Sequence, residues 1–179
     1  MSHYGIYQLI AEDDIHDVDL LDDGAFEENT SLSIACDYWN MSDKAYEEDV
    51  KDFIKAFGFK VYEEEKPFVL GTNDDEDAEP KAWNYFYADE TNIGIAREIN
   101  KNIFKALVDE VDFRREYFNE YTGEYQDSVL YKLSTIATPV TGTMLYFWGM
   151  SQNKASLAGF LESNKNKKIY IGNVGDWHC

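Results

Sequence analysis

The carboxylates of the first 80 residues are the side chains of this sequence with the most evident capacity for chemistry. The first 43 residues contain eleven Asp and Glu and no Lys or Arg, and the first basic residue is Lys44. Residues 44–80 add twelve acidic residues and five lysines, whereas the remaining 99 residues hold twelve acidic and eleven basic ones. Carboxylates at this density can bind a divalent cation, act as an acid–base pair, or attract a cationic partner.

The aspartate spacing does not match a calcium-binding loop. An EF-hand needs oxygen ligands at its first, third and fifth positions, glycine at the sixth and glutamate at the twelfth. A frame that starts at Asp19 has Leu21 in the third position and Thr30 in the last. A frame that starts at Asn73 has Ala78 where glycine is required. We therefore predict no metal site and no cofactor, and leave open the binding of an occasional divalent ion by an acidic cluster.

Residues for catalysis are few. The three histidines are His3, His16 and His178, and the sequence contains no glycine-rich phosphate loop and no dinucleotide-binding fingerprint. His16 lies among aspartates, which suits a local charge balance better than acid–base chemistry. We predict that the protein is not an enzyme. The alternative is an enzyme that uses buried carboxylates, for which the candidates are Glu98, Asp109 and Glu116.

The acidic series indicates the charge of a partner. The formal net charge is −19, and repulsion among like charges destabilises a compact state, so the concentration of acids calls for a physical reason. A negative field of this strength repels nucleic acid and anionic membranes and attracts basic proteins. A solvated face that only confers solubility is the competing interpretation, although a well-mixed surface would serve that purpose. The predicted partner-binding residues are Asp13, Asp14, Asp17, Asp19, Asp22, Asp23, Glu27, Glu28, Asp74, Asp75, Glu76 and Asp77.

In size, acidity and its acidic clusters at 12–28, 63–65 and 74–79, the chain resembles the small acidic nucleic-acid mimics of phages and mobile elements. These include anti-restriction proteins and some anti-CRISPR proteins, which occupy the nucleic-acid path of a bacterial defence nuclease. The resemblance is one of composition and transfers no functional residue. It implies an inhibitor in the bacterial cytoplasm that binds a basic nucleic-acid-binding protein and needs no cofactor.

Two other non-enzymatic functions fit the same charge pattern. An immunity protein that neutralises a basic toxin would present a similar field. A structural or adaptor protein of a virion or larger assembly would be expected to form a stable oligomer. The sequence leaves the identity of the target and the oligomeric state open, and it does not separate mimicry from allosteric blockage.

The elements that must position these carboxylates form an α+β pattern, with a mixed, mainly antiparallel sheet and three or four helices. Residues rich in β-formers or alternating in polarity predict strands at 4–10, 31–39, 59–64, 67–70, 83–87, 144–148 and 168–171. Residues 12–30 are expected to be pinned by scattered apolar anchors, with the carboxylates facing water. Residues 128–138 fit a helix or a strand equally well.

Three helices are predicted from apolar residues at helical spacing. The first is capped by Ser42 or Asp43, carries an apolar stripe of Tyr46, Val50, Phe53, Ile54 and Phe57, and ends at Gly58. The second is capped by Thr91 or Asn92 and extends to about Phe118. The third is short and is capped by Ser151.

The chain is predicted to be one domain over 1–179, with an acidic N-terminal half (1–80), a near-neutral C-terminal half (81–179) and two sub-lobes possible. The 44% apolar content excludes global disorder, and no apolar stretch is long enough to span a bilayer. Two cysteines, Cys36 and Cys179, do not form a disulfide framework, so a reducing cytoplasm is expected.

Overall fold

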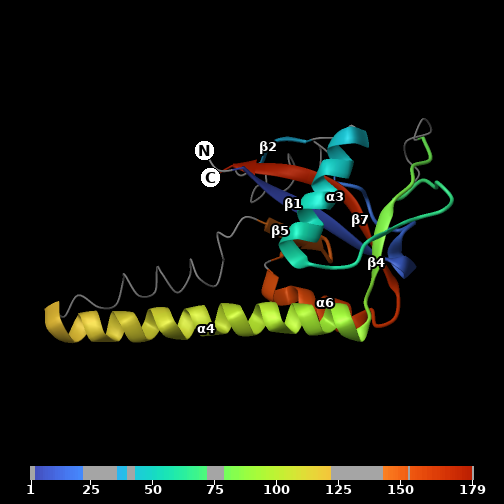
Figure 1. Ribbon diagram of the computed structural model, residues 1–179. Coiled ribbons are helices and arrows are strands. Elements are labelled where there is room, and N and C mark those ends of the chain that lie inside the picture. The colour runs from blue at the N-terminus through green and yellow to red at the C-terminus, as the bar shows by residue number, and fades with distance from the viewer. Residues whose placement is uncertain are drawn as a thin grey trace.

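A computed structural model of the chain describes residues 3–21, 36–39, 43–71, 79–121, 143–152 and 154–178 (Figure 1). The described strands form one seven-stranded sheet in the order β3-β4-β7-β1-β5-β6, with β2 also paired to β7. The pair β1–β5 is parallel and the other pairs are antiparallel, so the predicted α+β class with a mainly antiparallel sheet is confirmed. The strands are β1 (His3–Ala11), β2 (Cys36–Trp39), β3 (Tyr62–Glu63), β4 (Asn84–Tyr87), β5 (Thr143–Phe147), β6 (Met150–Gln152) and β7 (Lys168–His178); the helices are η1 (Glu12–Asp14), α3 (Asp43–Phe57), α4 (Glu90–Tyr121), η2 (Lys154–Ser156) and α6 (Leu157–Ser163).

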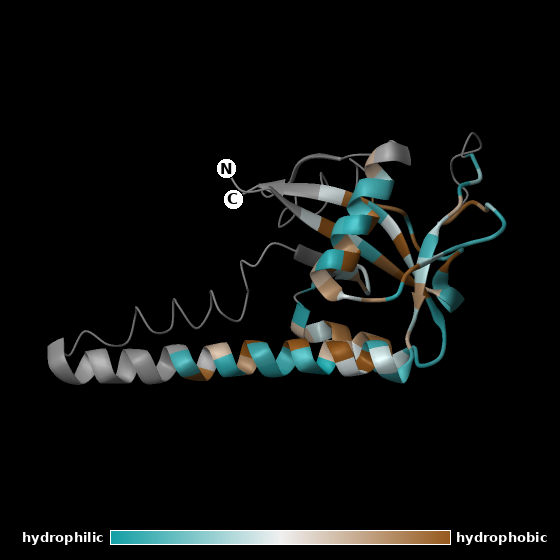
Figure 2. Cartoon of the chain, in the orientation of Figure 1, coloured by the Kyte–Doolittle hydropathy of each residue, from teal (hydrophilic) through white to brown (hydrophobic). Residues whose placement is uncertain are grey.

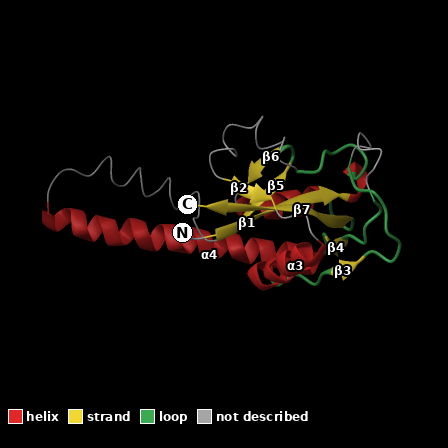
Figure 3. Ribbon diagram, turned by 90° about the horizontal axis from the view of Figure 1, so that it is seen from above, coloured by secondary structure: helices red, strands yellow, loops and turns green. Residues whose placement is uncertain are grey.

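The two faces of the sheet are covered by different segments, α3 on one face and the segment that follows β1 on the other. Successive side chains of a strand point to opposite faces, and Tyr7 and Phe86 both contact Phe53 of α3. Their neighbours Gln8 and Tyr85 therefore face away from α3, where Gln8 binds the backbone of the segment that follows β1. Seen from above, α3 lies on one side of the sheet and the chain after β1 on the other (Figure 3).

Helix α3 follows the predicted pattern closely. Tyr46, Val50, Phe53 and Phe57 are buried against the sheet, and the outer side of the helix is polar (Figure 2). Gly58, with φ of +73°, ends the helix by donating its N–H to the Ile54 carbonyl at 2.7 Å. Ile54 belongs to the same apolar stripe but lies at its margin, where it is 39% exposed.

Helix α4 begins at Glu90, and its N-cap lies two residues before Thr91, the first of its predicted caps. The Asp89 carboxylate accepts a hydrogen bond from the Asn92 N–H at 2.9 Å, so Asp89 is the N-cap residue instead of Thr91 or Asn92. The Asn92 side chain is buried and donates to the Tyr87 carbonyl. The first turns of α4 pack on α6, and the helix then extends well beyond the sheet (Figure 1).

Two further predictions were wrong. Residues 67–70 form no strand, since Phe68 makes only an isolated bridge to Lys81 while β3 pairs with β4. Ser151 caps no helix because it lies in β6, and α6 begins at Leu157. The predictions for residues 31–35 and 128–138 lie outside the described residues.

Candidate functional site

The acidic segment, residues 12–21, is fastened to the sheet through its backbone. Gln8 is 1% exposed; its Nε2 donates to the Asp19 carbonyl at 2.8 Å and its Oε1 accepts the Leu21 N–H at 3.0 Å. Asn173 of β7 donates to the Leu21 carbonyl at 2.9 Å, and the Gly71 N–H donates to the Ile15 carbonyl at 2.8 Å. These bonds satisfy buried polar groups and fix the path of the segment.

The side chains of the acidic segment divide by polarity. Leu21 is buried. Ile15, Val18 and Leu20 are partly buried and pack against the core. The predicted contact residues in this range, which are Asp13, Asp14, Asp17 and Asp19, are all exposed. The expectation that apolar anchors hold the backbone while carboxylates face water is confirmed for residues 12–21. The other predicted contact residues, Asp22, Asp23, Glu27, Glu28, Asp74, Asp75, Glu76 and Asp77, lie outside the described residues.

Lysines of the C-terminal half approach one end of the acidic segment. Lys167 Nζ lies 2.6 Å from the Asp13 carboxylate, and this hydrogen bond raises the pKa of Lys167. The backbone N–H of Lys168 donates to the Glu12 carboxylate at 3.2 Å. Asp13, one of the predicted contact residues, is therefore partly neutralised by a lysine of the C-terminal half.

A tyrosine-rich cluster lies on the same side of the sheet, on β3, β4 and β7. Lys168 Nζ is 2.6 Å from the Glu64 carboxylate, which also accepts the Tyr170 hydroxyl at 2.8 Å. The hydrogen bond from Lys168, and to a smaller extent the one from Tyr170, lowers the pKa of Glu64 below its ordinary value. Around them, Tyr85 packs on Tyr62 and Tyr170 with ring centroids 5.6 and 5.7 Å apart. The acidic segment thus has an aromatic neighbour on one flank.

The β5–β6 hairpin forms the other flank and carries an unusual turn residue. Its two turn residues, Trp148 and Gly149, have φ of +57° and +70°. A two-residue hairpin of this kind favours Asn-Gly, and positive φ in a bulky residue costs about 1–3 kcal/mol. Trp148 nevertheless occupies the first position and is 57% exposed.

A cavity of about 210 Å³ lies between this hairpin and the acidic segment. Its lining includes Trp148, Tyr146 and Phe160, together with Val18 and Asp14 of the acidic segment. Burial and the nearby negative charge of Asp19 raise the pKa of Tyr146. The hairpin and the acidic segment therefore share one largely apolar pocket, with Asp14 in its lining.

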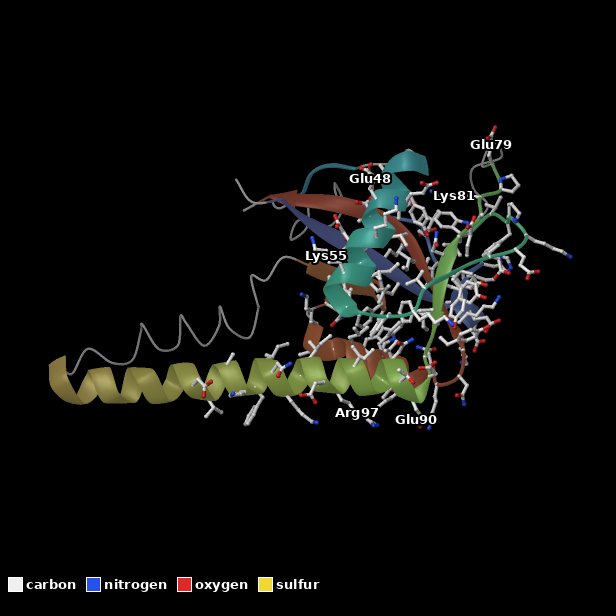
Figure 4. The ribbon with its side chains drawn as sticks, viewed as in Figure 1. Glu48, Lys55, Glu79, Lys81, Glu90 and Arg97 are labelled. Carbon is white, nitrogen blue, oxygen red and sulfur yellow. The ribbon has the colours of Figure 1, made fainter. Side chains whose placement is uncertain are left out.

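A larger groove of about 540 Å³ lies on the opposite side of the sheet, between α3 and β4. Its lining includes the carboxylates of Glu47, Glu63 and Glu79 together with Lys51 and Lys81. Lys81 Nζ lies 3.9 Å from the centroid of the Tyr46 ring. Glu79 and Lys81 lie on the β4 side of the groove, as Figure 4 shows. Charges of both signs occur in this groove, so it carries no single-sign field.

The described part of the chain offers few groups for chemistry. Within it, no group of three or more His, Cys, Asp and Glu side chains is placed to hold a metal ion. Glu98 is exposed and pairs with Lys101 at 2.9 Å, and Asp109 is exposed too, so the premise that they are buried acids was wrong. None of the described helices, α4 included, is apolar enough over a sufficient length to cross a bilayer.

Comparisons of this chain with models of known protein families, with curated proteins and with solved structures found no match.

The sequence reasoning missed the two aromatic flanks. Trp148 was assigned to a buried strand, whereas β5 ends at Phe147. The dipeptide Trp148-Gly149 between two apolar runs was a usable hairpin signal, because glycine in the second position of a two-residue turn is typical. The tyrosine cluster could not be found in this way, since it joins residues from three separate parts of the sequence.

Proposed function

We propose that this protein is a non-enzymatic inhibitor that binds a basic, nucleic-acid-binding protein of a bacterial defence system. The exposed carboxylates of the acidic segment would take the place of nucleic-acid phosphates in a groove lined by Lys and Arg. Long-range charge would steer association, and aromatic side chains beside the segment would supply short-range contacts.

The observation that carries the proposal is the fixed backbone beneath exposed carboxylates. Gln8 and Asn173 hold the acidic segment by hydrogen bonds, while Asp14, Asp17 and Asp19 remain exposed. A segment fixed before binding loses little conformational entropy when the complex forms. A purely solubilising surface needs no such attachment.

The first test is capture of a partner. The immobilised protein is incubated with bacterial lysate at low and at high salt, and bound proteins are identified by mass spectrometry. We expect a basic nucleic-acid-binding enzyme at low salt whose capture decreases as salt rises, because salt screens exposed charges. Retention of only non-basic proteins, or of a partner insensitive to salt, would contradict the proposal. Capture of a basic toxin without nucleic-acid chemistry would favour an immunity protein.

The second test locates the binding surface. With the captured partner, the double variant Asp17→Asn/Asp19→Asn should weaken binding by about tenfold or more, mainly through slower association. The matched control Glu48→Gln/Asp52→Asn removes the same charge from the exposed side of α3, on the other face of the sheet. Equal losses in both variants would show that only net charge matters and would remove the acidic segment from the site.

A further inference from the structure

The pocket between the β5–β6 hairpin and the acidic segment has the composition of a cation site. Its lining is mainly aromatic and apolar and includes Trp148, Tyr146 and Phe160. Asp14 also lines it, and Asp19 is close enough to influence Tyr146 electrostatically. Aromatic faces attract cations, and a carboxylate adds a charged hydrogen-bond acceptor.

Trp148 lies in the turn between β5 and β6, which is an exposed position with positive φ. Its ring packs nearly perpendicular to the rings of Phe147 and Phe160, at centroid distances of 5.0 and 5.6 Å. These contacts orient the indole, yet the residue stays 57% exposed. The turn would form more easily with Asn in this position. A strained, oriented and exposed tryptophan at the edge of a pocket indicates a contact with another molecule.

We infer that this pocket receives an arginine side chain of the basic partner protein, stacked on Trp148 and paired with Asp14. The inference rests on the proposed function, because it assigns the site that a cationic partner enters. Its volume of about 210 Å³ lies below the range of about 300–1,000 Å³ typical of small-molecule sites, and suits a single side chain. Charge complementarity selects a cation, and the negative lining disfavours a phosphate or a carboxylate ligand.

Arginine fits this lining better than lysine. Its planar guanidinium can stack on an indole face while its N–H groups reach a carboxylate, and it is less strongly hydrated than an ammonium. Its methylene stem can contact apolar side chains of the lining such as Val18 and Phe160. Tryptophan and arginine are also the residue types most enriched at energetic hot spots of protein interfaces.

The test uses peptides and therefore does not depend on knowing the partner. A capped Gly-Arg-Gly peptide is titrated into the isotopically labelled full-length protein, with Gly-Lys-Gly and Gly-Gln-Gly as comparisons. We expect saturable NMR shifts of the Trp148 indole N–H and the backbone of Asp14, with a dissociation constant on the order of 1 mM, since cation–π contacts and exposed ion pairs are each weak. Lysine should bind more weakly and glutamine should not bind.

Two variants make the assignment specific. Trp148→Asn suits the turn, so it should keep or raise Tm while weakening arginine binding about three- to tenfold. Asp14→Asn removes the ion pair without altering the hairpin. Phe104→Ala, which removes another exposed aromatic side chain from α4, is the control and should leave the titration unchanged.

The outcomes separate this inference from the proposed function. Arginine shifts that are spread over all acidic surfaces, or unchanged in Trp148→Asn and Asp14→Asn, would overturn the pocket assignment. A salt-sensitive basic partner could still be captured in that case, and the proposed function would stand. Arginine binding in the pocket without capture of any basic protein would support the pocket assignment and contradict the proposed function.

Discussion

At the scale of single residues, Glu64 links the end of β3 to β7, which lies far away in the sequence. Its carboxylate accepts hydrogen bonds from Lys168 and Tyr170, and its side chain is 20% exposed. The exposed pair of Lys165 and Glu90 has the same chemistry, with Glu90 68% exposed. Because water screens the second pair more strongly, the two glutamates should differ in their contribution to stability.

We predict that Glu64→Gln lowers the free energy of unfolding by about 1–3 kcal/mol at neutral pH, since charge-assisted hydrogen bonds are lost. The pKa of Glu64 is lower in the folded state than in the unfolded state. Its contribution is therefore present above the unfolded pKa and is lost as pH falls through the folded pKa. Urea unfolding at several pH values should show wild type and variant converging in acid. Glu90→Gln is the control and should change little; a pH-independent gap for Glu64→Gln would contradict the assignment.

At the scale of elements, the acidic segment depends on one buried amide. We predict that Gln8→Ala lowers the free energy of unfolding by about 2–4 kcal/mol, because the buried Leu21 N–H and the part-buried Asp19 carbonyl lose their partner. Amide exchange at Leu21 should accelerate more than exchange in α3. Arg97→Ala, which breaks an exposed ion pair with Glu162, should leave Leu21 protected. Unchanged exchange at Leu21 in Gln8→Ala would mean that the apolar anchors alone hold the segment.

Some helices and strands could be predicted from the sequence and others could not. Strong periodicity with an adjacent stop signal was sufficient for α3, where Gly58 ends the helix as expected. The strand predicted at 67–70 failed because a strand needs a partner, and the neighbouring chain pairs through Phe68 and Lys81 only. The role of Gln8 was also hidden, since nothing local in a strand reveals which distant carbonyl its amide will reach. The exposure of Asp13, Asp14, Asp17 and Asp19 was predictable, whereas the tyrosine cluster depended on the pairing of strands distant in the sequence.

At the scale of the whole molecule, the net charge of −19 opposes folding. We predict that raising NaCl from about 0.02 to about 0.3 M increases the free energy of unfolding on the order of 1 kcal/mol, or about 2–4 °C in Tm. Differential scanning calorimetry measures this directly. The salt effect should diminish near pH 4.5, where protonation begins to remove the repulsion. A Tm that falls with salt at neutral pH would show that internal ion pairs such as Asp13–Lys167 outweigh the repulsion.

The pairing of β1 with β7 has a kinetic consequence. Ala11 lies opposite Ile169, and β1 also pairs with β5, so the middle of the sheet is assembled from segments that lie far apart in the sequence. Closing so long a loop is slow, because its entropy is lost before the contacts that compensate for it can form. We therefore expect β1 to remain unpaired during synthesis until the ribosome has delivered β5 and β7. Its flanking negative charges would then keep nascent chains apart during that interval.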